Sequence, residues 1–133
     1  GIPYEMKVCS AHRTPARAPE FGSTAKERGL KCIIAAAGMA AHLAGVMGSL
    51  TSLPILGVPM DGKVMGGLDA LLSTVQMPKG IPVATFAVGS HGAVNAALFA
   101  VSILATADPE MAKKLDDYRA AQTAAIPEEV PAE

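Results

Sequence analysis

Four short apolar runs, each followed by a loop and then by a segment of helical composition, constrain the fold of this chain more than any other feature of its sequence. The runs cover residues 5–9, 31–37, 53–58 and 82–88. Apolar runs of this length, bounded by turn-forming residues, are typical of strands. Strands that alternate with helices form a parallel sheet with helices on both faces. We therefore predict a three-layer α/β fold of the flavodoxin-like or Rossmann-like kind.

The segments between these runs carry helix signals. Thr14 and Pro15 predict the N-cap and the first turn of a helix over residues 15–28, and Gly29 predicts its end. By the same reasoning, further helices are expected over residues 39–50, 68–75 and 93–107.

The most apolar stretch, residues 92–107, is about 16 residues long, which is shorter than the roughly 20 that a membrane-spanning helix needs. We expect a buried helix there. A helix that is apolar all round needs cover on every side, and so small a chain offers little cover. The stretch therefore predicts contacts between copies of the chain, in a homo-oligomer.

The C-terminal part of the chain is expected to form a last helix that docks on the protein, followed by a tail. Asp108 is expected to cap a last helix, in which Met111, Leu115 and Tyr118 share one stripe that would dock on the protein. Residues 127–133 are rich in proline and glutamate and are expected to be a disordered tail. We predict a single domain over residues 1–126, which agrees with the length of 133 residues and with the 50% of apolar residues.

The balance of charges and the cysteines exclude several classes of function. Lys and Arg number 11 against 12 for Asp and Glu, so the sequence predicts no nucleic-acid partner and no membrane-binding patch. Cys9 and Cys32 both lie in or beside apolar runs, where reduced core thiols are expected rather than a disulfide framework. No signal peptide is recognisable, and we expect a cytoplasmic protein.

Ligands of such sheets bind outside the carboxyl ends of the strands, so the loops that follow the apolar runs are the candidate site. All histidines of the chain, His12, His42 and His91, fall in these loops. The loops cover residues 10–14, 38–42, 59–66 and 89–92.

His12 and Arg13 stand between a predicted strand and the start of a predicted helix, where backbone N–H groups favour an anion such as a phosphate. Arg13 would add forked donors, and His12 a group that gives or takes a proton near neutral pH. The alternative is an ordinary helix start with two solvated side chains, and the residues alone leave both open. Taken alone, His42 and His91 read as a packing and a loop residue, and no spacing of ligands predicts a metal site.

Several motifs together resemble the PurE family, and the resemblance covers nearly the whole chain. They are Ser10-Ala11-His12-Arg13-Thr14-Pro15, residues 38–45, Gly67-Leu68-Asp69, Val75-Gln76-Met77-Pro78, Gly80-Ile81-Pro82-Val83 and Asn95-Ala96-Ala97-Leu98. The Arg of the first motif and the run Ala40-Ala41-His42-Leu43 favour the bacterial mutase class over the animal-type carboxylases. This class implies an isomerase of purine biosynthesis, without ATP, metal or other cofactor. It moves a carboxylate from the exocyclic nitrogen of an aminoimidazole ribonucleotide to ring carbon four.

The resemblance also implies roles for particular residues. His12 would move the proton, and Ser10 and Arg13 would hold the ribose phosphate. The imidazole and carboxylate pocket would be lined by Ala37, Gly38, His42 and Leu43. The family implies a homo-octamer whose sites are shared between subunits.

Some of the family's features are absent or altered in this chain. The family's first strand and its Gly-Ser-x-Ser-Asp loop are not found, and Gly1-Ile2-Pro3 reads as the end of a helix, so we expect a fragment of a longer gene product. Met39 stands where the family commonly has Gly, and Ala44 where it commonly has Pro. Two alternatives stay open: a carboxylase that uses free carbon dioxide, and an inactive oligomerising remnant.

Overall fold

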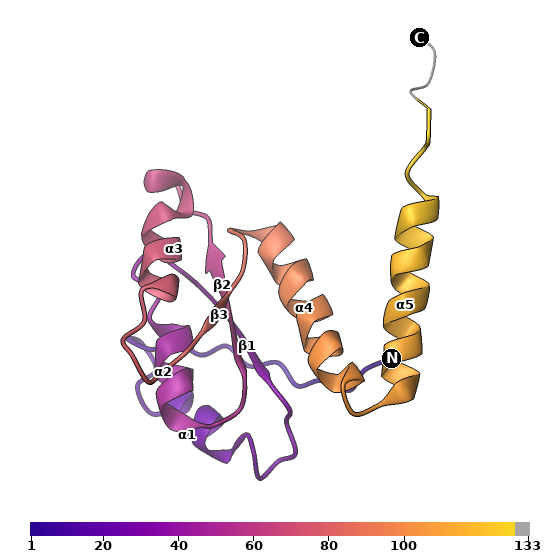
Figure 1. The fold of residues 1–133 in the computed structure, drawn as a ribbon. Coiled ribbons are helices and arrows are strands. Elements are labelled where there is room, and N and C mark those ends of the chain that lie inside the picture. Colours follow the sequence, from indigo (N-terminus) through magenta and orange to yellow (C-terminus); the bar gives the residue numbers. More distant parts are fainter. Residues whose placement is uncertain (130–133) are drawn as a thin grey trace. The chain divides into compact units, whose positions relative to one another are not determined.

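A computed structural model describes residues 1–129 of the chain and shows an α/β fold around a parallel sheet of three strands, in the order β1-β2-β3 (Figure 1). The predicted alternation of strands and helices is confirmed. In chain order the elements are α1 (Arg17–Thr24), β1 (Ile33–Gly38), α2 (Leu43–Leu50), β2 (Ile55–Met60), the 3-10 turn η1 (Met65–Gly67), α3 (Leu68–Val75), β3 (Ala84–Thr85), α4 (Ser90–Ala105) and α5 (Pro109–Ala124).

The chain divides into two compact units, Gly1–Ala96 and Ala97–Glu133, with the division inside α4. The sheet and helices α1 to α3 belong to the first unit, and α5 belongs to the second. Of the predicted tail, residues 127–129 are exposed and lie beyond the last helix, and residues 130–133 lie outside the described residues. A single domain over residues 1–126 stays a prediction.

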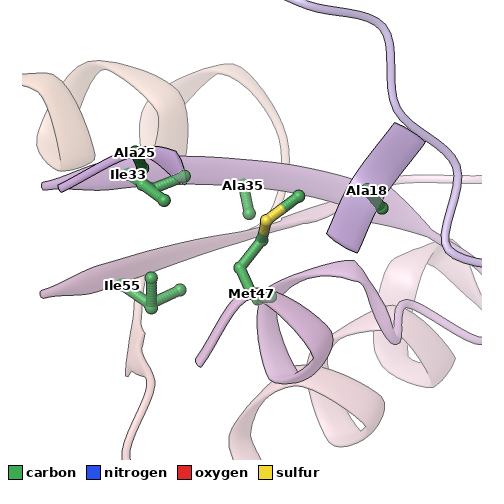
Figure 2. Close-up of a cluster of buried hydrophobic side chains, with 7 residues drawn as sticks. Ala18, Ala25, Ile33, Ala35, Met47 and Ile55 are labelled. Atoms are coloured by element: carbon green, nitrogen blue, oxygen red, sulfur yellow. The ribbon is translucent and has the colours of Figure 1, made fainter. Parts of the chain in front are cut away.

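The core of the first unit is built from small side chains around one methionine. Met47 of α2 is 2% exposed, and Figure 2 shows its side chain extending toward the strand that carries Ala35. The close approach of the helices depends on glycine, because a Cβ at Gly22 of α1 would lie 3.1 Å from the Met47 sulfur. The whole cluster consists of Ala18, Ala25, Ile33, Ala35, Ala44, Met47 and Ile55. Small residues therefore bring α1 and α2 close to the sheet.

Residues 5–9 do not form the predicted strand. Their alternation is real, but Tyr4, Met6 and Val8 are more than 80% exposed, and no strand of residues 1–129 pairs with this segment. It is held instead by arginines, since Arg17 Nη1 donates to Val8 O at 2.8 Å and Arg28 Nε pairs with Glu5 at 3.0 Å. A strand exists only through hydrogen bonds to a neighbour, which an alternating pattern cannot supply.

The fourth predicted strand, over residues 82–88, is reduced to Ala84–Thr85. Phe86 N donates to Gly57 O, but the next bond to β2 comes from Gly89 N to Pro59 O, so one extra residue interrupts the register. Such an insertion is a bulge, and Pro59 has no N–H to continue the ladder. The strand lies where it was predicted, but it is much shorter than predicted.

The helix over residues 15–28 is shorter than predicted, and its N-cap is Ala16, not Thr14. The Thr14 hydroxyl is engaged with Ser10 in the preceding loop. The predicted end is also wrong, because α1 ends at Thr24 and a separate turn over residues 25–29 follows it, closed by the N–H groups of Gly29 (φ +88°) and Leu30 on the carbonyls of Lys26 and Ala25.

The other helix predictions match the structure to different degrees. The helix over residues 68–75 is confirmed at both ends as α3, whereas the one predicted from residue 39 begins only at Leu43. Asp108 caps α5 as predicted, and its carboxylate accepts from Glu110 N at 2.9 Å and Met111 N at 3.2 Å. Of the predicted stripe on α5, only Leu115 is buried.

The apolar helix α4 is not buried in the described chain. Only Gly92 and Ala96 of this helix are buried, and the side chains of Val94 and Phe99 are 54% and 47% exposed. Within residues 1–129, no helix combines the length and the hydropathy that crossing a membrane requires. The prediction of a helix covered on all sides is therefore wrong for a single copy of the chain.

Candidate active site

A pocket of about 650 Å³ lies at the carboxyl ends of β1 and β2, where the parallel sheet predicts a ligand site. Residues from the loop before α1, from the end of β1 with its following loop, and from the end of β2 form its walls. They are Cys9, Ser10, Ala11, His12, Arg13, Ala36, Ala37, Gly38, Met39, Ala40, His42, Leu43 and Met60. The residues to which the family resemblance assigns a role all line this pocket, namely Ser10, His12, Arg13, Ala37, Gly38, His42 and Leu43.

The loop over residues 10–14 is closed by its own side chains. Thr14 Oγ1 accepts from Ser10 N at 2.7 Å and donates to Ser10 O at 2.8 Å, while Thr14 N also donates to Ser10 O at 3.0 Å. Ser10 Oγ in turn accepts from Arg13 N at 3.1 Å. These bonds fix the two ends of the loop to each other, so that His12 and Arg13 occupy its tip.

The loop over residues 38–42 is shaped by its backbone. Met39 has a φ of +58°, in the left-handed region, and His42 N donates to Ala40 O at 2.9 Å in a three-residue turn. Ala41, at the centre of that turn, is 1% exposed and anchors it in the protein. The turn thereby fixes the direction in which His42 leaves the backbone.

The two loops meet through their histidines. His12 Nε2 lies 2.8 Å from His42 Nδ1, and the ring centroids are 4.9 Å apart with planes inclined at 88°. One ring nitrogen must donate and the other accept, so the protonation of each ring constrains that of its partner. Such a pair can take up a proton from one position of a ligand and return it to another.

Arg13 supplies the positive charge of the pocket. It is exposed, and within residues 1–129 no hydrogen bond or ion pair engages its guanidinium. Nor does any group of three or more His, Cys, Asp or Glu in this part of the chain stand close enough to hold a metal ion. An unengaged guanidinium beside two imidazoles is suited to an anionic ligand that exchanges protons.

Two predicted loops contribute little to this pocket. Of residues 59–66 only Met60 lines it, and none of residues 89–92 does. His91 lies in the first turn of α4, whereas His12 and His42 come together. Grouping the histidines by their position in loops therefore included His91, which does not line the pocket.

Two lining residues, Cys9 and Ala36, lie outside the loops and residues that the sequence predicts for the site. Cys9 directly precedes the loop over residues 10–14 and Ala36 directly precedes Ala37, so their place at the ends of apolar runs was the available signal. Met39 and Met60 lie within predicted loops, but no binding role was assigned to them.

Comparison with known proteins places the chain among related sequences. The model of the family described as AIR carboxylase matches residues 1–125. An N5-carboxyaminoimidazole ribonucleotide mutase from Vibrio vulnificus is 55% identical over 126 residues, which are 95% of this chain and 78% of the relative. A protein of the same name from Pyrococcus abyssi is 58% identical over 118 residues, which are 89% of this chain and 67% of the relative. A bifunctional purine synthesis protein purC/E from Dictyostelium discoideum is 53% identical over 128 residues, which are 96% of this chain and 13% of that much longer protein.

Proposed function

The chain belongs to the AIR carboxylase family, and on that premise we propose that it converts N5-carboxyaminoimidazole ribonucleotide to 4-carboxy-5-aminoimidazole ribonucleotide in purine biosynthesis. The observation that carries the proposal is the pair His12 and His42, 2.8 Å apart in a pocket that also holds Arg13. Relatives named as mutases cover most of the chain at more than half identity, which supports the same reaction.

The reaction moves one carboxylate and one proton. The bond between the exocyclic nitrogen and the carboxylate carbon breaks and releases carbon dioxide, and ring carbon four then attacks this carbon dioxide. Carbon four loses its proton and the exocyclic nitrogen gains one, so no oxidant, reductant or ATP enters the balance. A group that both donates and accepts within one turnover is required, and imidazole does so near neutral pH.

His12 is proposed as that group, with His42 as its hydrogen-bonded partner in the substrate pocket. When His12 gives up a proton from Nδ1 and later takes one back there, its Nε2–H goes on donating to His42 Nδ1, which keeps the 2.8 Å contact satisfied. A positioned acid/base contributes about 10²- to 10⁴-fold in rate. Enclosure in the pocket adds proximity, because released carbon dioxide stays beside the ring carbon.

The remaining lining residues are proposed to bind the ribonucleotide. Arg13 and the Ser10 hydroxyl would hold the phosphate, since Ser10 Oγ accepts from Arg13 N and keeps its own proton to donate. Ala37, Gly38 and Leu43 would form the walls for the imidazole and its carboxylate. A volume of about 650 Å³ is in the range of pockets that hold small ligands.

We further propose that the protein acts in the cytoplasm as a homo-oligomer, an octamer as the resemblance implies. The exposed apolar side chains Val94 and Phe99 on α4 support contacts between copies, because a helix so rich in apolar residues gains stability when it is covered.

The test is turnover of N5-carboxyaminoimidazole ribonucleotide by the protein without ATP or added bicarbonate, followed by ultraviolet absorbance or mass spectrometry of the product. Wild type is expected to convert it, and His12→Asn to lower kcat by about 10²-fold or more. A reaction that starts from 5-aminoimidazole ribonucleotide and depends on bicarbonate would favour the carboxylase alternative instead. No turnover from either substrate would reject the proposal and favour an inactive remnant.

A further inference from the structure

Met39 occupies an unfavourable backbone conformation in the wall of the pocket. Its φ is +58°, in the left-handed region that favours glycine, and its side chain is 75% exposed while lining the pocket. An exposed thioether gains little from packing on its own protein. Packing of this side chain on its own protein therefore does not offset the strain of the backbone. A ligand bound in the pocket would supply the missing contact.

A second methionine offers a matched comparison. Met65, in η1, has a φ of +59° and is 61% exposed, but it does not line the pocket. The two residues share chemistry, backbone conformation and exposure, and differ in place. An effect of substitution or of a bound ligand that is seen at Met39 and not at Met65 therefore comes from the position of Met39 in the pocket.

The conformation of Met39 is set by its neighbours in the chain. Ser73 Oγ of α3 lies 3.5 Å from Met39 O, but its hydroxyl donates to Asp69 O at 2.7 Å. The longer contact therefore contributes little to the conformation of Met39. The buried Ala41 and the turn onto Ala40 fix the residues that follow Met39. The side chain is therefore presented at a defined point of the pocket wall.

We propose that Met39 is a substrate contact, whose thioether packs against the face of the planar aminoimidazole ring and sets the affinity for it. The inference rests on the proposed function. Arg13 suits the phosphate and the paired imidazoles suit the groups that exchange protons, and of the two methionines that line the pocket Met39 is exposed whereas Met60 is partly buried, so Met39 is the polarizable side chain that a ring face between the apolar walls can reach. Sulfur makes favourable contacts with aromatic rings, and a bound ring would remove apolar surface from water.

Kinetics of matched variants test this assignment. Met39→Ala keeps the left-handed strain and loses the thioether, so KM is expected to rise roughly three- to tenfold, with kcat within about twofold of wild type. Met39→Leu, of similar volume, should lie between the two, and Met65→Ala should leave both constants unchanged. An unchanged KM in Met39→Ala would overturn the proposal.

Met39→Gly separates the side chain from the backbone. This variant relieves the strain and also removes the thioether, so its KM should rise as much as that of Met39→Ala. If Met39→Gly had the wild-type KM while Met39→Ala did not, the backbone rather than the side chain would set affinity, and the contact would be wrong.

Oxidation by hydrogen peroxide gives a readout that needs no turnover. Met6, Met39 and Met65 are 81%, 75% and 61% exposed, so all three should form sulfoxide readily in the free protein. Saturating 5-aminoimidazole ribonucleotide should slow the oxidation of Met39 alone, as peptide mass spectrometry would show. Equal protection of the three, or of none, would overturn the contact. Protection of Met39 in a protein without turnover would reject the proposed reaction and keep the contact.

Discussion

The two loops that supply the paired histidines are held in place in different ways. In residues 10–14, Ser10 and Thr14 bond to each other through side chain and backbone, four positions apart in the chain. In residues 38–42, no comparable staple exists among the hydrogen bonds of residues 1–129, and the shape comes from a left-handed residue, a tight turn and the buried Ala41. The first loop is built from its own residues, whereas the second depends on the protein around it.

This difference matters because the candidate chemistry needs both loops at once. A contact of 2.8 Å between His12 and His42 is kept only if both backbones hold their positions to within a fraction of an ångström. A locally stapled loop should tolerate changes elsewhere in the protein. A loop fixed by burial should respond to changes in the core beneath it.

The largest effect is expected where the loops meet. His12→Asn and His42→Asn should each lower kcat, His12 by about 10²- to 10⁴-fold. If the rings act as one unit, the double variant should lose little more than His12→Asn alone, as residues in one hydrogen-bonded unit are not additive. Steady-state kinetics of the four proteins measures this coupling. Losses that multiply would show that the rings act independently.

The second loop should be sensitive to overpacking. Ala41→Leu adds volume at a position that is 1% exposed and should lower the free energy of unfolding by about 1–3 kcal/mol. Ala40→Leu is the matched control, because Ala40 is exposed, and it should change stability by less than about 0.5 kcal/mol. Urea unfolding followed by circular dichroism measures both. Equal stability of the two variants would contradict the role given to burial.

A smaller change is expected when the staple of the first loop is cut. Thr14→Val removes the hydroxyl that bonds Ser10 N and Ser10 O, at similar volume, and should lower the free energy of unfolding by about 1–2 kcal/mol. Thr14→Ser keeps the hydroxyl and serves as the control. The same urea titration applies, and a Thr14→Val protein as stable as Thr14→Ser would mean that the backbone alone closes the loop.

The smallest effect concerns the thiol of Cys32, just before the strand that leads into the loop over residues 38–42. Cys32 directly precedes β1, and burial raises the pKa of its thiol above the ordinary value. The folded protein thus holds this proton more tightly than the unfolded chain, so the free energy of unfolding should fall as the pH rises through the alkaline range. In Cys9→Ser protein, alkylation of Cys32 by iodoacetamide should require a higher pH when folded than in urea. Identical pH profiles would contradict this.

Local signals determined much of the outcome. The limits of α3 and the cap at Asp108 follow from residues within one turn of each other, so their prediction did not depend on the rest of the fold. The position of the pocket after β1 also follows from a general property of parallel sheets.

What the sequence could not determine are the contacts between distant residues. His12 and His42 are 30 positions apart, and only the packing of both loops at one edge of the sheet brings their nitrogens to 2.8 Å. Residues 5–9 have the pattern of a strand without a partner among residues 1–129, and a bulge opposite Pro59 shortens β3 to two residues. Pattern and propensity act over a few neighbouring residues, whereas strand pairing, burial and the histidine contact are decided by which segments the tertiary structure places side by side.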